Sequence, residues 1–347
     1  MIINKKFWKN KKILITGHTG FKGSWLILIL KSLGSNIIGY SLHPEKKSLF
    51  NELILRKEIK NYYNDINDYK SFNKVLKKHK PQIIFHLAAQ PLVIDSYKDP
   101  YYTFQTNVLG TLNVIENIKN ISSIKSSVIV TTDKCYKNLN NKKKFKESDN
   151  LGGKDPYSWS KVCAEYIAES YINNYFNNKN IGLSTVRAGN VIGLGDYGKH
   201  RIIKDIIESF NNNKIIKLRY PKSIRPWQNV VDALLGYIIL AEKSYNNKKY
   251  NGAWNFGPDK DEKITVEEIT KKMIKLQNFK KGYKLVKNNF NEAKYLFLDS
   301  SKSLKQLKWK PVNNIDQTLE QIVEWNQTKN KKKYIDMLLN NILLNYL

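Results

Sequence analysis

Short apolar segments alternate with amphipathic ones along the first 190 residues of the chain. Apolar runs of this kind, bounded by turn residues, are typical of strands buried in a parallel sheet. The predicted strands cover residues 12–16, 36–40, 82–87, 127–132 and 181–186, with a further short strand that ends at 64–66. The predicted helices cover residues 23–33, 68–79 and 100–120, and another begins at 156. This alternation predicts an α/β fold with a doubly wound parallel sheet.

The regular alternation stops after Gly189. Three glycines, Gly193, Gly195 and Gly198, mark a loop, and irregularly spaced helices and short strands follow. We therefore expect a first domain at residues 1–189 and a smaller mixed α/β lobe at 190–347 that faces the substrate. Apolar residues between about 228 and 245 are expected to return to the sheet. In a doubly wound sheet, ligands bind at the carboxyl ends of the strands.

The composition raises the question of nucleic-acid binding, because the formal net charge is +29. Of the 59 basic residues only five are arginines, and the lysines are spread along the whole chain with many Asn and Ile residues. A nucleic-acid-binding surface would instead show clustered basic residues on one face. A general Lys/Asn/Ile bias explains the charge, so we expect no nucleic-acid partner.

Cysteine content and hydropathy indicate a cytoplasmic, soluble protein. Cys135 and Cys163 are too few for a disulfide framework. The longest early apolar run, residues 25–30, is far shorter than a membrane span requires. We therefore expect no membrane contact. No group of residues has the spacing of metal ligands, so we also expect no bound metal.

A glycine-rich turn follows the first strand. Gly17, Gly20 and Gly23 are three residues apart and precede an apolar helix. This Rossmann-type arrangement allows a tight turn, close approach of backbone to a pyrophosphate, and close packing of helix on strand. The second strand ends in Ser41-Leu42-His43, without the acidic residue that often binds the ribose of NAD. From this position alone the choice between NAD and NADP stays open.

Tyr157 and Lys161 are four residues apart on a predicted helix, so their side chains share one face. A nearby ammonium group favours the phenolate and lowers the pKa of a phenol. The pair therefore predicts the base of a hydride-transfer enzyme. A surface Tyr and Lys would show the same spacing, but the position of the pair one strand after Thr132 and at the right distance behind the glycine turn favours the functional interpretation.

Arginines gather where substrate is expected. Four of the five arginines lie between residues 187 and 225, in a chain that otherwise uses lysine. Arginine binds diphosphates through two parallel hydrogen bonds, which lysine cannot do. We expect Arg201 and Arg225 to hold the diphosphate of a substrate.

Several short motifs together resemble the extended short-chain dehydrogenase/reductase superfamily over essentially the whole chain. The motifs are Gly17–Trp25, Ala88–Val93, Thr132–Tyr136, Tyr157 with Lys161, Arg187–Gly193, Arg225–Gln228 and Trp254–Pro258. The resemblance is closest to the nucleotide-sugar dehydratase branch, and within it to members that act on CDP-glucose. It implies NAD as cofactor, CDP-glucose as substrate, loss of water from C5 and C6 after transient oxidation of C4, and a homo-oligomer. A role in deoxysugar supply for cell-surface glycans follows.

The resemblance also implies roles for individual residues. Cofactor binding is expected of Gly17, Thr19, Gly20, Phe21, Lys22, Gly23, Asp65, Ile66, Leu87, Ala88, Ala89, Asn107, Tyr157, Lys161 and Ala188. Substrate binding is expected of Gln90, Asn190, Arg201 and Arg225. The catalytic residues are expected to be Thr132, Asp133, Lys134, Tyr157 and Lys161.

The Asp133-Lys134 pair stands where related dTDP-glucose dehydratases have Asp-Glu. Asp133 can act as an acid only if burial raises its pKa. Lys134 can act as a neutral base, or it can stay charged and stabilise an enolate, and both alternatives are open. An epimerase, or a dehydratase for a UDP-, GDP- or dTDP-sugar, would share the cofactor half of the chain.

Overall fold

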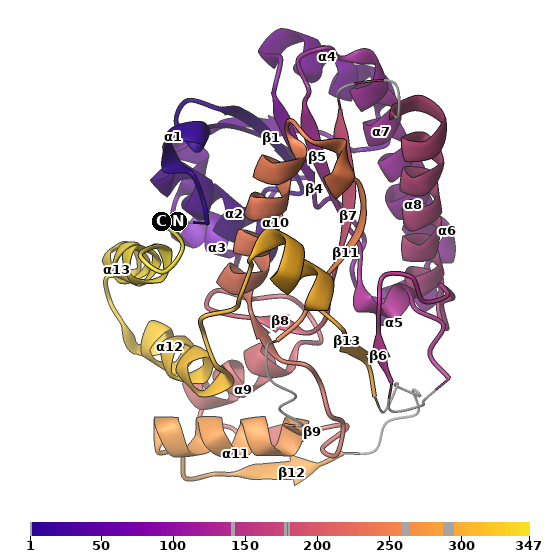
Figure 1. Ribbon diagram of the computed structural model, residues 1–347. Helices are drawn as coiled ribbons and strands as arrows, with labels where there is room; N and C mark the ends of the chain where they lie inside the picture. Colours follow the sequence, from indigo (N-terminus) through magenta and orange to yellow (C-terminus); the bar gives the residue numbers. More distant parts are fainter. Residues whose placement is uncertain (1, 140–142, 177–178, 180, 259–263, 287–294) are drawn as a thin grey trace.

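The computed structural model describes residues 2–139, 143–176, 179, 181–258, 264–286 and 295–347 (Figure 1). Its centre is a seven-stranded sheet in which every neighbouring pair is parallel. The strand order is β11-β7-β5-β4-β1-β2-β3. The strands are β1 (Lys12–Thr16), β2 (Asn36–Ser41), β3 (Lys60–Tyr63), β4 (Ile83–His86), β5 (Ser126–Val130), β7 (Gly182–Ala188) and β11 (Gly252–Phe256). The predicted doubly wound parallel fold is confirmed.

The position of the site follows from this strand order. The chain winds outward from β1 toward β3 on one side, and then returns to place β4 on the other side of β1. Loops that leave β1 and β4 therefore diverge, which opens a crevice at their carboxyl ends. The glycine turn after β1 and residues 87–89 after β4 lie at this crevice.

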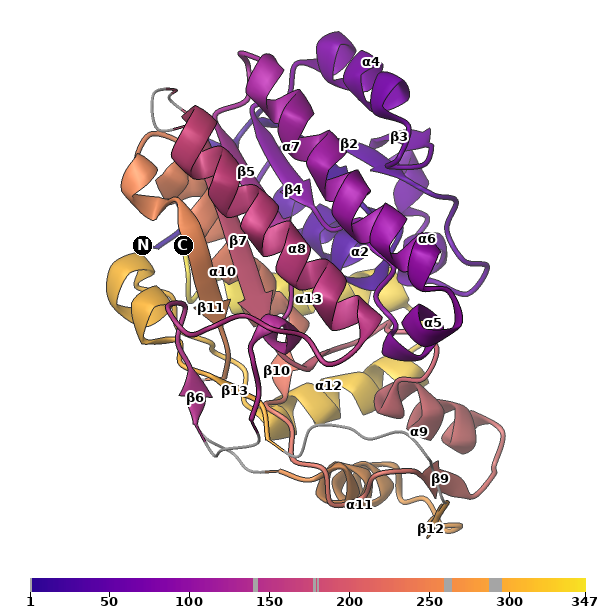
Figure 2. The ribbon, with the colours of Figure 1, turned by 90° about the vertical axis from the view of Figure 1, so that its right-hand side faces the viewer.

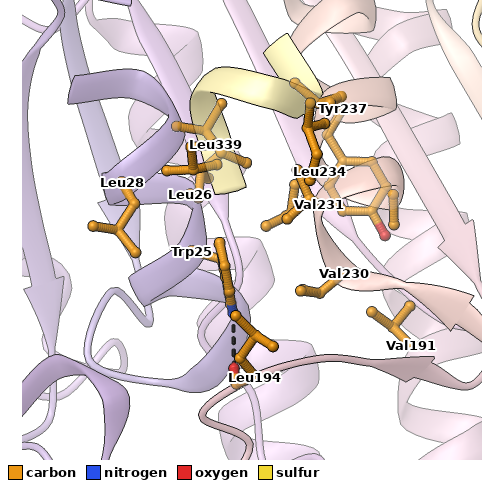
Figure 3. Close-up of a cluster of buried hydrophobic side chains, with 14 of the residues drawn as sticks. Trp25, Leu26, Leu28, Val191, Leu194, Val230, Val231, Leu234, Tyr237 and Leu339 are labelled. Carbon is orange, nitrogen blue, oxygen red and sulfur yellow. Dashed lines mark hydrogen bonds between the residues drawn. The ribbon is translucent and has the colours of Figure 1, made fainter. Parts of the chain in front are cut away.

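Helices cover both faces of the sheet (Figure 2). On one face lie α4 (Tyr69–His79), α7 (Gly110–Asn120) and α8 (Pro156–Tyr171), whose apolar residues share a core with β1, β4 and β5. On the other face lie α2 (Phe21–Ser32), α10 (Val230–Ser244) and α13 (Lys331–Leu343). Figure 3 shows part of this second core, where the Trp25 indole donates a hydrogen bond to the Leu194 carbonyl at 3.0 Å.

A smaller lobe lies below the sheet in Figure 1. It contains α9 (Ile202–Asn211), β9 (Ile216–Leu218), α11 (Val266–Gln277), β12 (Tyr283–Leu285) and α12 (Ile315–Gln327). Short parallel pairs join β9 to β12, β8 (Val191–Ile192) to β10 (Gln228–Asn229), and β6 (Lys144–Phe145) to β13 (Phe297–Leu298). Short helices complete the fold: α1 (Lys5–Trp8), α3 (Leu49–Glu52), α5 (Val93–Lys98) and α6 (Pro100–Phe104).

Three details differ from the sequence prediction. The seventh strand, β11, comes from the second half of the chain and was not included in the predicted sheet. The third strand ends at Tyr63, because Asp65 accepts a hydrogen bond from the Asn67 amide at 2.8 Å and turns the chain. The predicted helix at 100–120 contains a π-helical stretch, Gln105–Leu109, between α6 and α7.

Candidate active site

One cavity of about 1450 Å³ lies over the carboxyl ends of the central strands and extends toward the smaller lobe. It brings together residues that are far apart in the sequence. The predicted site residues that line it are Gly17, Thr19, Gly20, Phe21, Lys22, Gly23, Asp65, Ile66, Leu87, Ala88, Ala89, Thr132, Asp133, Lys134, Tyr157, Lys161, Ala188, Asn190, Arg201 and Arg225. A cavity of this size has room for more than one drug-sized ligand.

The glycine turn is too compact for side chains. Gly17 has φ +70°, and a Cβ on it would lie 2.7 Å from the Ala88 amide nitrogen. A Cβ on Gly23 would lie 2.3 Å from the Gly17 carbonyl oxygen. The Thr16 hydroxyl accepts hydrogen bonds from the Leu87 and Ala88 amides at 3.1 and 3.2 Å, which joins this turn to the next strand end. The bare backbone here fits a dinucleotide pyrophosphate.

The end of the cavity next to β2 has the features of an adenosine site. The hydroxyls of Thr19 and Ser41 are 2.9 Å apart, and Thr19 also donates to the Leu42 carbonyl at 3.1 Å. Asp65 and Ile66 form the neighbouring wall. Hydroxyl groups thus occupy the end of β2, where a ribose-binding carboxylate often stands.

Two predicted residues do not line the cavity in the described part of the chain. Asn107 is fully buried, accepts from the Gln90 amide at 2.8 Å and donates to the Gln90 carbonyl at 3.0 Å. The Gln90 side chain donates to Thr103 at 2.9 Å and points away from the cavity. Both residues hold the loop after β4 in place, and Asn107 also donates to the Ser160 hydroxyl of α8 at 2.8 Å.

Tyr157 and Lys161 lie on the cavity face of α8, as predicted. The helix begins at Pro156, and the Asp155 carboxylate caps it by accepting from the Ser158 amide at 2.8 Å. Tyr157 and Thr132 both line the cavity. The Lys161 ammonium donates to the Val130 carbonyl at 3.0 Å, and burial lowers its pKa to about 8.

The pKa of Tyr157 differs from the sequence prediction. Burial raises it, and the neighbouring Thr132 side chain and the charge of Arg201 only partly oppose this effect. Lys161 does not reverse the direction, because its ammonium is directed to the carbonyl of Val130. The predicted acidification of Tyr157 by Lys161 is therefore wrong for the protein alone, and further positive charge is needed to favour the phenolate.

Asp133 has the character of an acid. It is almost fully buried, and burial raises its pKa, while the charges of Lys134, Arg225 and Lys22 oppose this. One carboxyl oxygen accepts from the Thr132 hydroxyl at 3.1 Å, and the other has no partner among the described residues. A carboxyl group whose pKa is raised by burial is suited to protonate a leaving group. Lys134 is half-buried in the adjoining wall.

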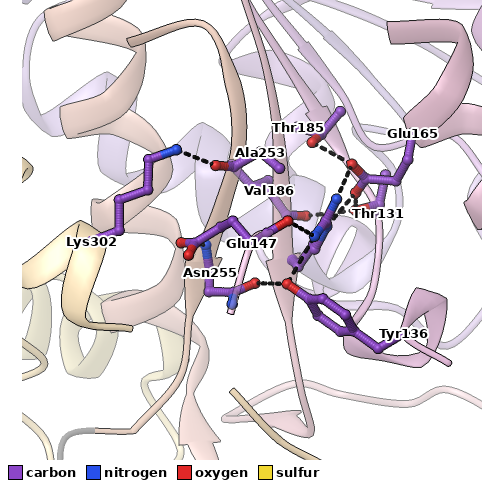
Figure 4. Close-up of polar contacts among 10 residues, drawn as sticks. Thr131, Tyr136, Glu147, Glu165, Thr185, Val186, Ala253, Asn255 and Lys302 are labelled. Atoms are coloured by element: carbon purple, nitrogen blue, oxygen red, sulfur yellow. Dashed lines mark hydrogen bonds and ion pairs between the residues drawn. The ribbon is translucent and has the colours of Figure 1, made fainter. Parts of the chain in front are cut away.

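A buried ionic network lies beside this wall (Figure 4). Glu165 of α8 accepts from both Nε and Nη2 of Arg187, at 2.9 and 2.8 Å, and also bonds to the hydroxyls of Thr131 and Thr185. Arg187 in turn donates to the Tyr136 hydroxyl at 2.8 Å. Arg187 therefore has a structural role, unlike the two arginines that are expected to bind substrate. The network anchors both α8 and the loop that carries Asp133.

Sequence reasoning missed Glu165. It lies one helical turn after Lys161 and is buried in the packed side of α8. An acidic residue at such a position signals a buried partner, because an unpaired carboxylate is not tolerated in a core. The partner itself, on β7, could not be identified from the sequence.

The two arginines expected to bind substrate differ in their surroundings. Arg201 is ion-paired with the buried Asp196 at 3.1 Å and is partly exposed. Arg225 is buried and donates to its neighbouring Ile224 carbonyl at 2.9 Å. Both guanidinium groups border the same cavity as Asn190, on the side of the smaller lobe.

Comparison with known proteins agrees with this geometry. A family model described as GDP-mannose 4,6 dehydratase matches residues 14–322. The chain belongs to this family. A CDP-glucose 4,6-dehydratase from Salmonella typhimurium is 44% identical over 94% of this chain and 93% of its own length. A dTDP-D-glucose 4,6-dehydratase from Dictyostelium discoideum is 29% identical over 77% of this chain and 62% of its own length.

Solved structures share the family fold. A dTDP-glucose 4,6-dehydratase from Bacillus anthracis in complex with NAD has a TM-score of 0.78 at 24% identity, covering 93% of this chain and 98% of its own. An epimerase from Methanothermobacter thermautotrophicus has a TM-score of 0.84 at 22% identity, covering 97% and 98%. Across the described residues, no helix is both long and apolar enough to cross a lipid bilayer.

Proposed function

We propose that the chain is an NAD-dependent CDP-glucose 4,6-dehydratase. The observation that carries the proposal is that Asp133, a buried carboxyl group with a raised pKa that accepts a hydrogen bond from Thr132, lines the same cavity as Tyr157. Tyr157 is suited to a proton transfer at the C4 hydroxyl, and Asp133 is suited to a proton transfer at a leaving hydroxyl. The 44% identity to the Salmonella typhimurium enzyme supports CDP-glucose as the substrate.

The chemistry requires both transfers. The proton on C5 of a hexose is not acidic, and hydroxide is a poor leaving group. A ketone at C4 makes the C5 proton acidic, and protonation of the C6 hydroxyl lets it leave as water. Bound NAD supplies the oxidant for C4 and later the reductant for C6, and its positive ring favours the Tyr157 phenolate. The glycine turn and the cavity beside Thr19 and Ser41 fit that dinucleotide.

Each side chain then has a defined task. Thr132 holds the C4 hydroxyl, and Tyr157 accepts the proton of that hydroxyl. Lys161 orients the nicotinamide ribose beside Tyr157. Asp133 protonates the departing C6 hydroxyl. Lys134, acting as a neutral amine, takes the C5 proton, and the ammonium that forms then stabilises the enolate. Arg201 and Arg225 hold the diphosphate.

Incubation with CDP-, dTDP-, UDP- and GDP-sugars, followed by mass spectrometry, tests the proposal. We expect loss of one water from CDP-glucose and no reaction with the other nucleotides. An isomeric product of unchanged mass would identify an epimerase instead, since epimerisation at C4 needs no acid for the C6 hydroxyl. Deuterium at C4 of the sugar should appear at C6 of the product, and its release to solvent would contradict the cycle.

We further propose that two copies of the chain pair through α6, α7 and α8, which lie side by side on one outer face (Figure 2). Large apolar side chains are exposed there: Tyr101 is 78% exposed, Leu109 52% and Tyr166 53%. Pairing of these helices with a second copy would remove the three side chains from water. Light scattering should give a dimer mass, and Leu109→Glu with Tyr166→Glu should give a monomer; a monomeric wild-type protein would contradict the pairing.

The proposed product suggests where the enzyme works in the cell. A 4-keto-6-deoxy sugar is a precursor for 6-deoxyhexoses, so we place the enzyme in the cytoplasmic supply of deoxysugars for lipopolysaccharide or O-antigen glycans. Loss of such a sugar from surface glycans after deletion of the gene would test this placement.

A further inference from the structure

Tyr136 comes directly after the short 3₁₀ turn Asp133–Cys135, which carries the two residues proposed for elimination. It is only 1% exposed, although it borders the cavity. Its ring is stacked on the ring of Phe145, with the ring centres 4.9 Å apart and the planes at 16°. The Arg187 guanidinium lies 4.8 Å from the centre of the Tyr136 ring. A phenylalanine could make both ring contacts, so these contacts do not explain the hydroxyl group.

The Tyr136 hydroxyl is held by two hydrogen bonds (Figure 4). It donates to the side-chain oxygen of Asn255 at 2.8 Å and accepts from Nη1 of Arg187 at 2.8 Å. Asn255 and Arg187 are paired in register on β11 and β7, so the hydroxyl joins the turn to two strands of the sheet. The buried Asn255 amide nitrogen donates to the carbonyls of Phe145 and Asp299 at 2.8 and 3.2 Å. These two bonds fix the orientation of the amide, and its oxygen therefore faces Tyr136.

Asp133 has little freedom to adjust if this turn moves. One carboxyl oxygen accepts from the Thr132 hydroxyl at 3.1 Å. The other oxygen packs against Gly189 at the end of β7, because a Cβ on Gly189 would lie 3.0 Å from that oxygen and 3.0 Å from Cγ of Pro226. The φ angle of Gly189 is not positive, so a glycine is needed here for close approach and not for backbone conformation. The position of the carboxyl group therefore follows the position of the turn.

The residues proposed for oxidation at C4 are held separately from Tyr136. Tyr157 and Lys161 lie on α8, and this helix is joined to β7 by the two hydrogen bonds between Glu165 and Arg187. Removal of the Tyr136 hydroxyl leaves both of those bonds in place. The turn after β5 and the helix α8 therefore have different anchors, and a change in one anchor should affect one part of the reaction more than the other.

On the basis of the proposed dehydratase function, we propose that Tyr136 is a positioning residue for the loss of water and not for the oxidation at C4. Its hydroxyl, held by Asn255 and Arg187, fixes the turn on the sheet. The turn then places Asp133 at the C6 hydroxyl and Lys134 at the C5 proton. Tyr136 itself transfers no proton. A misplacement of about 1 Å in a reacting group can cost about 100-fold in rate, so a single anchoring hydroxyl is enough to matter.

Rapid mixing of the Tyr136→Phe holoenzyme with CDP-glucose separates the two parts of the reaction. The absorbance of reduced nicotinamide follows oxidation at C4, and mass spectrometry of quenched samples follows the loss of water. We expect the reduced cofactor to form as fast as in wild type and then to accumulate, because product formation should be about tenfold slower or more. CDP-6-deoxyglucose has no C6 hydroxyl to lose, so the variant and wild type should oxidise it equally fast.

Tyr346→Phe is the matched control. Tyr346 is also almost fully buried, and its hydroxyl donates to the Lys310 carbonyl away from the cavity. This variant therefore loses a buried hydroxyl without a change near the turn. Oxidation and product formation should both match wild type.

Other outcomes would overturn the proposal. Equal slowing of oxidation and product formation by Tyr136→Phe would show a general structural role, and unchanged product formation would show no role in elimination. If Tyr136→Phe does not fold, Gly189→Ala tests the same dependence, because its methyl group displaces the Asp133 carboxyl. That variant should retain oxidation and slow product formation, and unchanged product formation would contradict the proposal, which requires elimination to depend on where Asp133 lies. Failure of wild type to release water from CDP-glucose would instead refute the dehydratase function.

Discussion

Glu165 and Arg187 form a buried ion pair through two hydrogen bonds, 2.8 and 2.9 Å long, and both side chains are only 4% exposed. The pair joins the helix that carries Tyr157 and Lys161 to strand β7. The same arginine reaches the Tyr136 hydroxyl, just past the loop with Asp133. This one ion pair therefore supports both the helix with Tyr157 and Lys161 and the loop with Asp133.

Glu165→Gln should destabilise the protein by about 3–5 kcal/mol, because it leaves the Arg187 charge buried without a counter-charge. Urea denaturation followed by circular dichroism would measure this loss. Asp336→Asn is a suitable control, since Asp336 forms an exposed ion pair with Lys332 at 3.6 Å. We expect that control to cost less than about 1 kcal/mol. Equal losses for the two variants would argue against a supporting role for the buried pair.

Tyr157→Phe should reduce turnover by about 10²–10⁴-fold, the usual contribution of a positioned acid or base. CDP-glucose binding, measured by calorimetry, should change little, because the ring and the fold are retained. Tyr166→Phe alters an exposed tyrosine of the same helix and should leave turnover unchanged. Unaltered turnover in the Tyr157 variant would remove this residue from the mechanism.

Lys161 should make stability depend on pH in a defined window. Burial lowers the pKa of Lys161 from 10.5 to about 8, so between these pH values the unfolded chain binds more protons than the folded one. The free energy of unfolding of wild type, relative to Lys161→Met, should therefore rise with pH between about 8 and 10.5. Denaturation curves at several pH values would show this slope, whereas the exposed control Lys243→Met should show none. A flat or falling difference for Lys161→Met would contradict the burial of a charged amine.

Arg225→Lys should weaken CDP-glucose binding by about tenfold or more, because lysine cannot form the two parallel hydrogen bonds that arginine offers a diphosphate. Turnover at saturating substrate should stay close to wild type, since Arg225 is not assigned to a proton transfer. Calorimetry gives the affinity, and initial rates give turnover. Arg56→Lys, at an exposed position of the β2–β3 connection, serves as the control. An unchanged affinity for Arg225→Lys would place the diphosphate elsewhere.

Local pattern alone determined much of this protein. The alternation of apolar and amphipathic segments predicted the parallel sheet, because the hydrophobic periodicity of a strand or a helix depends on residues that are close in sequence. The glycine spacing located the turn after β1, and the four-residue spacing placed Tyr157 and Lys161 on one helix face. Those features depend on residues close together in the chain.

Tertiary structure decided the electrostatics and the membership of the sheet. β11 joined the sheet through pairing with β7, across some 65 residues of chain, and Arg187 proved to be the partner of Glu165 and not a substrate ligand. The direction of the Tyr157 pKa depends on how completely packing removes water around the phenol. Burial and long-range contact arise only when the layers pack, so no local spacing could predict them.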